Sequence, residues 1–156
     1  SHGSALSPVS PHALTRARAR VISRCTLAVR RAAADVAADD WLRVADDSWA
    51  RVRCVVLSPC AGGVASLRRV GATLLTPWNP VRVRGAWHFP ALVGAPVEVA
   101  AAHVFNFVLD TSHELLVDGL PCVTLGHGLG EPVAAHPFWG TGAVLDELRR
   151  HAGWAK

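Results

Sequence analysis

The residues with the clearest chemical potential are Thr76 and Asn79, a hydroxyl and an amide three positions apart. They lie in the run Thr76-Pro77-Trp78-Asn79-Pro80, where two prolines restrict the backbone. Both side chains offer hydrogen bonds, but an amide cannot act as a general acid at neutral pH. The same two side chains can instead close an Asx or Ser/Thr turn that only shapes the loop. Taken alone, these residues leave both interpretations open.

Two predicted strands position this loop. The apolar run that ends at Leu74-Leu75 is typical of a buried strand, and Pro77 removes a backbone donor that a longer strand would need. After the loop, Val81–Val83 alternates apolar residues with arginine, Arg84-Gly85 turns the chain, and Trp87-His88-Phe89 begins the return. The pattern predicts a hairpin with Thr76 and Asn79 at its mouth.

Short apolar or alternating runs, separated by turn residues, recur along the rest of the chain and predict an all-β domain. One helix is expected over about 142–151, with Thr141 as its N-cap and Val144, Leu145 and Leu148 as its apolar stripe. The other expected strands are residues 13–22, 25–29, 50–57, 65–70, 97–102, 104–109, 115–117 and 122–125. A hairpin turn at Asp118-Gly119 is expected between the last two of these strands.

The central stretch, Thr76 to Val81 followed by Gly85-Ala86-Trp87-His88-Phe89-Pro90, resembles the central block of Hint domains. These are the self-processing modules of inteins and hedgehog proteins, and the most similar subfamily is Vint, the Hint domain associated with von Willebrand A domains. Further resemblances lie in Val104–Asp110, in Leu115–Gly119 and in Val123–Gly128, and the whole covers about residues 13–154. The resemblance implies a Hint/intein-like β-horseshoe with pseudo-twofold halves and a short C-terminal helix.

The same resemblance organises the chain into three parts. Residues 1–12 are expected to be a tag remnant or irregular segment, residues 13–130 the Hint-like β domain, and residues 131–156 an extension whose helix packs on that domain. The alanines at 32–34 would suit a helix. The Hint pattern instead implies a turn at Asp39-Asp40 followed by a strand over Trp41–Val44.

The implied chemistry is an N-to-S acyl shift. In the family, a cysteine at the first position of the domain attacks the preceding carbonyl, a threonine hydrogen-bonds the scissile backbone, and a histidine supplies the proton. Thr76 matches the threonine, but Asn79 stands where the family has its histidine. His127 matches the late-block histidine, although a turn histidine between two glycines is the alternative. His113 could orient the late block, or could be an exposed turn residue. Thr76, Asn79 and His127 are expected to lie around one cleft near the N-terminal strand.

The nucleophile of the family has no direct match in this sequence. Counting back from Asp39-Asp40 places the first cysteine of the family between Ser10 and Arg16, where this sequence has none. Ser10 is the possible hydroxyl substitute. Cys25 is the nearest thiol downstream, and its other interpretation is a small core residue within a strand. His127 is followed by Gly128, so the asparagine that cyclises in inteins is missing.

Three functions follow from these residues. The first is an autoprocessing domain that is inactive or attenuated, either by natural degeneration or by introduced substitutions; its partner would be its own upstream polypeptide, and a von Willebrand A domain could belong to the same protein. The second is a non-catalytic Hint-fold binding module. The third, a nucleic-acid-binding domain, is disfavoured because the arginines behind the net charge of +4 are scattered and form no single basic patch in the sequence.

The composition sets the remaining limits. About half of the 156 residues are apolar, which excludes a disordered chain. No two of the four cysteines have CxxC spacing, so neither a metal site nor a cofactor is expected. Cys54 and Cys122 have the surroundings of core residues. No apolar run reaches about 18 residues, so no membrane span is expected.

Overall fold

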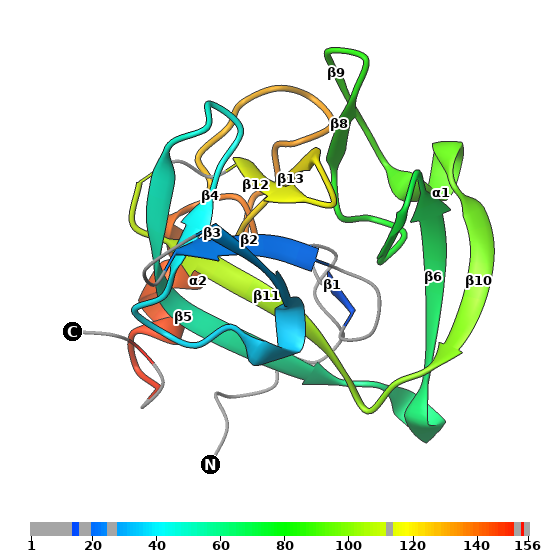
Figure 1. Cartoon of the computed structure of the whole chain (residues 1–156), viewed down its shortest axis with the longest axis horizontal. Coiled ribbons are helices and arrows are strands. Elements are labelled where there is room, and N and C mark those ends of the chain that lie inside the picture. The colour runs from blue at the N-terminus through cyan, green and yellow to red at the C-terminus, as the bar shows by residue number, and fades with distance from the viewer. Residues whose placement is uncertain (1–13, 16–19, 25–27, 112–113, 152–153, 155–156) are drawn as a thin grey trace.

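The computed structural model describes residues 14–15, 20–24, 28–111, 114–151 and 154. Within them the chain forms two antiparallel β-sheets and a few short helices (Figure 1). This confirms the all-β prediction. The short helical segments are η1 (Ala33–Asp35), η2 (Ala61–Gly63), α1 (Pro90–Val93) and α2 (Gly142–Leu148).

The larger sheet contains nine of the described strands. Their order across the sheet brings the N-terminal strand β1 between β7 and β11, far from its neighbours in sequence. The order is β10 (Ala95–Ala100), β6 (Val64–Val70), β7 (Thr73–Leu75), β1 (Leu14–Thr15), β11 (His103–Leu109), β5 (Trp49–Pro59), β4 (Trp41–Arg43), β2 (Arg20–Arg24) and β3 (Ala28–Ala32).

The smaller sheet has the order β12 (Glu114–Val117), β13 (Leu120–Val123), β8 (Val81–Val83) and β9 (Ala86–His88). The predicted turns at Arg84-Gly85 and Asp118-Gly119 both have positive φ at their two residues. That is the signature of type I′ turns, whose twist matches the twist of the strands they join. The β8–β9 and β12–β13 hairpins are thus confirmed.

The main core lies between the two sheets. Its buried members come from strands of both, including Leu42, Val52, Leu75, Val81 and Phe107. β5 and β11 form the longest antiparallel pair, and β5 alternates buried and partly exposed residues along its length. β11 is buried on both faces, because Phe105 and Phe107 join the main core whereas Val104 and Val108 join two other clusters.

The C-terminal extension packs on the outside of this β structure. Val144 and Leu148 of α2 are buried against Cys54, Val108 and Leu125. Thr141 caps the helix as predicted, accepting a hydrogen bond from the Ala143 N–H at 3.3 Å. The helix is shorter than expected. It ends at Leu148, since the next N–H groups, of Arg150 and His151, bond three residues back.

Several element boundaries differ from the sequence-based expectation. Residues 32–34 divide between the end of β3 and η1, and α1 was not expected. The turn before β4 is confirmed: Asp39 has a φ of 75°, and its carboxylate lies 2.7 Å from the Arg51 guanidinium. The expected strand over 13–22 corresponds to β1 and the start of β2, with residues 16–19 outside the described part. The pseudo-twofold relation of the halves stays a prediction.

Candidate functional site

The loop that carries Thr76 and Asn79 is a tight turn anchored by tertiary contacts. The Asn79 N–H donates to the Thr76 carbonyl at 3.2 Å, with Pro77 at the second position of the turn. The Pro77 carbonyl accepts from the Ala91 N–H of α1 at 2.8 Å, and the Trp78 ring meets the Phe89 ring edge-on at 5.2 Å. The loop is therefore fixed to α1 and to the residue before it; the two prolines predict a restricted backbone but not these contacts.

β1 brings the N-terminal side of the domain to this loop. Leu14 pairs with Leu75 of β7 on one side and with Phe105 of β11 on the other, both antiparallel. Antiparallel pairing directs the N-terminal end of β1 toward the C-terminal end of β7, where Thr76 follows. Thr76 therefore lies beside the point where the polypeptide enters the sheet.

Asn106 lies on the same sheet face as Thr76, across β1. Leu74 and Val104 share one buried cluster, so the residues two positions on, Thr76 and Asn106, continue that face. Two strand spacings, about 10 Å, separate β7 from β11. Asn106 is buried, and neither polar atom of its side chain has a hydrogen-bond partner among the described residues. The entry point of the chain is thus flanked by a hydroxyl and an amide.

Asn79 is a second buried amide. Its side chain is 0% exposed, and among the described residues neither its oxygen nor its nitrogen has a hydrogen-bond partner. A buried amide without partners costs about 1–3 kcal/mol of folding free energy. A residue that carries such a cost is typically present for a reason other than the stability of the fold. Asn79 therefore differs from an ordinary turn asparagine, which would bond its own loop.

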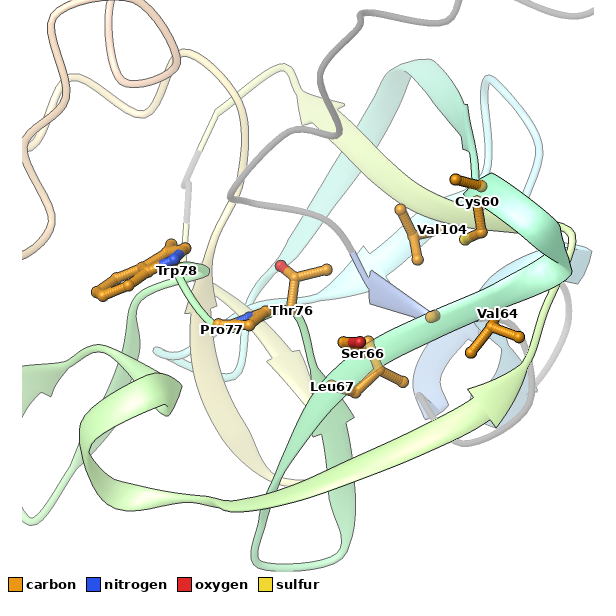
Figure 2. A pocket seen from close by; sticks show the side chains of 10 residues that line it. Cys60, Val64, Ser66, Leu67, Thr76, Pro77, Trp78 and Val104 are labelled. Atoms are coloured by element: carbon orange, nitrogen blue, oxygen red, sulfur yellow. The ribbon is translucent and has the colours of Figure 1, made fainter.

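An elongated cavity of about 230 Å³ opens beside Thr76. Figure 2 shows Trp78 at one end, Thr76 and Ser66 near the middle, and Cys60 and Val64 at the other end. The remaining lining residues are Ala61, Ala65, Leu67, Pro77 and Val104. The lining includes neither Asn79 nor His127 among the described residues, so Thr76 is the part of the predicted site that faces this cavity.

His127 is packed against the C-terminal extension. It is 4% exposed, and its Nδ1 accepts from the Leu129 N–H at 2.9 Å. The flanking N–H groups of Gly126 and Gly128 donate to the carbonyls of Trp139 and Gly140, both at 2.8 Å. A Cβ on Gly140 would lie 2.9 Å from Cε1 of the ring, so the imidazole packs directly on that glycine.

Residues 123–127 connect His127 with the Thr76–Asn79 loop. The Val123 N–H donates to the Pro80 carbonyl at 3.2 Å, and the Leu125 N–H donates to the Phe107 carbonyl at 3.0 Å. The segment therefore passes from the residue after Asn79 to the residue after Asn106, and reaches His127 two positions later. The expected gathering of Thr76, Asn79 and His127 around one cleft stays a prediction.

Residues 20–156 match the model of the Vint family, a Hint domain. The chain belongs to the Vint family of Hint domains. Among curated proteins, none matches the sequence. Within the described part of the Vint domain, no helix is long and apolar enough to cross a membrane, and no group of three His, Cys, Asp or Glu side chains is placed to hold a metal ion.

The two candidate nucleophiles, Ser10 and Cys25, and the possible orienting residue His113 lie outside the described residues of the Vint domain. Asn106 was missed, because a single asparagine in an apolar strand gives no sign of which strand will lie beside it.

Cys54 and Cys122 are buried core residues, as their surroundings in the sequence indicate. Burial raises the pKa of Cys54 to about 11 and also raises the pKa of Cys122. Cys60 differs, since it is only partly buried and lines the cavity beside Thr76. Desolvation raises the pKa of Cys60 too, so its thiol is a slow but accessible nucleophile.

We expect the Vint domain to lose stability in mild acid through His136. Its Nδ1 accepts from the N–H groups of Phe138 and Trp139, at 3.1 and 3.0 Å, and desolvation lowers its pKa. The unfolded chain therefore binds this proton more readily. The stabilisation is complete above the unfolded pKa of about 6.5 and is lost as the pH falls toward the folded pKa.

Urea unfolding of the parent and of His136→Asn between pH 7.5 and 5 measures this effect. Asparagine keeps an acceptor for the two N–H groups but does not titrate. The variant should therefore lose less unfolding free energy across the range. Equal losses in the two proteins would show that His136 is not the responsible group.

Proposed function

We propose that this Vint domain is an autoprocessing module whose N-terminal acyl shift is lost or attenuated by Asn79. The observation that carries the proposal is the position of β1. Its N-terminal end points toward Thr76, which matches the threonine that the family uses on the scissile backbone. The upstream polypeptide would then pass the hydroxyl of Thr76 and the amide of Asn106 as it enters the domain.

In the proposed reaction, a side-chain thiol or hydroxyl at the start of the domain attacks the carbonyl carbon of the preceding residue. The carbon–nitrogen bond breaks, the nitrogen takes a proton, and a thioester or ester forms. Water or another nucleophile then displaces the domain from the acyl group. Thr76 would hydrogen-bond the scissile peptide, and the amide of Asn106 would orient it from the other side of β1.

The difficult step is protonation of the departing nitrogen. An imidazole titrates near neutral pH and can deliver this proton, whereas the amide of Asn79 cannot. Asn79 is also fully buried, so bulk water does not reach its side chain to substitute for an acid. The proposed domain therefore keeps the positioning groups of the reaction and lacks its acid.

A non-catalytic binding module is the second candidate function. The Asn79 amide, which has no hydrogen-bond partner among the described residues, favours it, because a natural asparagine there would mean that the acid was given up. The cavity beside Thr76 would then hold a partner segment rather than a scissile bond. The residue at position 79 in the natural gene distinguishes the two functions: histidine favours processing, and asparagine favours binding.

The direct test uses the domain joined to its natural upstream segment. We expect the parent precursor to remain intact over hours at pH 7 when followed by gel electrophoresis and intact mass. Added hydroxylamine releases the upstream segment where a thioester or an ester has formed, and an added small thiol releases it from a thioester, so the two reagents report the first step by itself. Rapid cleavage of the parent would contradict the assignment of Asn79 as a missing acid.

A further inference from the structure

We propose that a second cavity, of about 440 Å³ between β5 and α2, binds a small organic anion through the guanidinium groups of Arg53 and Arg149. The anionic group is a phosphate or a carboxylate, and it is carried by a flat apolar body such as an aromatic ring. Among the described residues, the lining includes none of Thr76, Asn79 and Asn106. The proposal therefore goes beyond the acyl shift and does not depend on it.

A β-bulge places Arg53 at this cavity. In the antiparallel pair of β5 and β11, Cys54 pairs with Val108. Val52 pairs with the very next residue, Leu109, so Arg53 is an extra residue without a partner on β11. Such a bulge bends its strand and can re-aim a side chain. Arg53 is only partly buried, and within the described part of the chain its guanidinium has no ion-pair partner. It can therefore bind a ligand without breaking an existing ion pair.

Arg149 supplies the second positive charge from the end of α2. Its guanidinium lies over the Trp154 ring, 5.3 Å from the ring centroid, and 3.3 Å from the Asp146 carboxylate. Both members of the ion pair are more than half exposed. Water screens such a pair, which contributes little to stability. Arg149 therefore keeps most of its attraction for a ligand.

The charged groups of the lining leave an excess of positive charge. Asp110 is the acidic residue of the lining, and its Oδ1 accepts from the Arg51 N–H at 2.9 Å. Two arginines and one aspartate give the lining a net charge of +1. A guanidinium binds two oxygens of a carboxylate or a phosphate at once, through charge-assisted hydrogen bonds. The lining therefore selects an oxyanion.

The other lining residues and the size of the cavity indicate what carries the anion. They are apolar or glycine: Val108, Leu109, Gly126, Leu145 and Trp154. A volume of about 440 Å³ falls within the range of about 300–1,000 Å³ that is typical of small-molecule sites. The Trp154 ring offers a flat surface to an aromatic group. A bare inorganic ion would leave this apolar surface in water.

Isothermal titration calorimetry of the Vint domain with phenyl phosphate, at constant ionic strength, tests the site. Arg53→Gln and Arg149→Gln should each raise the dissociation constant at least about tenfold, because each removes charge-assisted hydrogen bonds. Arg150→Gln is the matched control. Arg150 is adjacent in sequence but pairs with Glu147 and does not line the cavity, so its loss should leave the dissociation constant unchanged.

Asp110→Asn tests the site in the opposite direction. Asparagine keeps an acceptor for the Arg51 N–H and removes a negative charge, so phenyl phosphate should bind more tightly than in the parent. Partial unfolding cannot produce this gain. Arg53→Lys keeps the charge and loses the forked geometry, so its dissociation constant should lie between those of the parent and Arg53→Gln. It also replaces Arg53→Gln if that variant does not fold.

Three further probes define the ligand. Inorganic phosphate should bind at least about tenfold more weakly than phenyl phosphate, because it buries no apolar surface. Phenol should not bind measurably, and comparing phenyl phosphate with benzoate distinguishes a phosphate from a carboxylate. The proposal is overturned if neither aromatic anion binds with a dissociation constant below about 1 mM. Equal affinities in the parent, Arg53→Gln and Arg149→Gln would overturn it as well.

Discussion

A precursor that carries both Asn79→His and Ser10→Cys is expected to release its upstream segment at least about a hundredfold faster than the parent. A positioned general acid contributes about a hundredfold or more, which is about 3 kcal/mol of barrier. The thiol supplies the nucleophile that the sequence lacks between Ser10 and Arg16. The measurement is the fraction of cleaved precursor against time at pH 7, with and without added thiol.

Four precursors separate the contribution of the acid at position 79 from that of the nucleophile at position 10. They are the parent, each single change and the double change. If acid and nucleophile act as one unit, the single changes should each do little and the double change should cleave. Asn79→Gln is the matched control, since it lengthens the side chain at the same buried position without providing an acid. Ala13→Cys tests the residue directly before Leu14 as an alternative nucleophile.

Because Asn79 is fully buried, a substitution at this position can change the stability of the domain as well as the cleavage rate. A larger ring in a fully buried site can cost about 1–3 kcal/mol of stability by overpacking. Thermal unfolding of each precursor therefore accompanies the kinetics. No cleavage from any folded precursor with an intact upstream junction would favour the binding module.

Gly126→Ala is expected to destabilise the domain by about 2–5 kcal/mol. Gly126 has a φ of +67°, which costs an L-residue about 1–2 kcal/mol. A Cβ there would also lie 2.6 Å from Cδ2 and 2.7 Å from Cγ of Leu145, so the Leu145 side chain, or α2 that carries it, would have to shift. Overpacking of this kind adds about 1–3 kcal/mol. Denaturant unfolding measures the total.

Gly128→Ala separates the two contributions. Gly128 has a similar φ of +72°, but a Cβ there would meet nothing within 4 Å, so only the backbone term remains. Gly140→Ala and Gly142→Ala form a second pair without a positive φ. A Cβ at position 140 would lie 2.9 Å from Cε1 of the His127 ring, whereas a Cβ at position 142 would meet nothing within 4 Å. Equal losses for Gly126→Ala and Gly128→Ala would show that Leu145 yields without cost.

The sequence predicted most strongly those features that depend on nearby residues. The turn at Arg84-Gly85 and the cap at Thr141 are each specified by residue types within a few positions, and the structure confirms both. The helix α1 was missed because four residues carry no period. It is held instead by the bond from the Ala91 N–H to the Pro77 carbonyl, fourteen residues earlier.

The candidate site divides in the same way. The loop of Thr76 and Asn79 could be located from its two prolines, but the burial of Asn79 could not. Asn106 becomes part of the site only because β1 inserts between β7 and β11. The packing of His127 depends on Gly140, thirteen residues downstream. Contacts over such separations follow from strand order, which local patterns do not encode.

The two backbone hydrogen bonds on either side of His127 limit where the protein can be truncated or fused to another protein. The N–H groups of Gly126 and Gly128 donate to the carbonyls of Trp139 and Gly140. Residues after His127 in the sequence therefore help to hold the backbone on both sides of that histidine. A fragment that stops near residue 130 would lose those carbonyl partners together with the cover that α2 gives to Leu125. The smallest transplantable unit therefore includes α2, and a cargo protein is better attached after it than at the histidine.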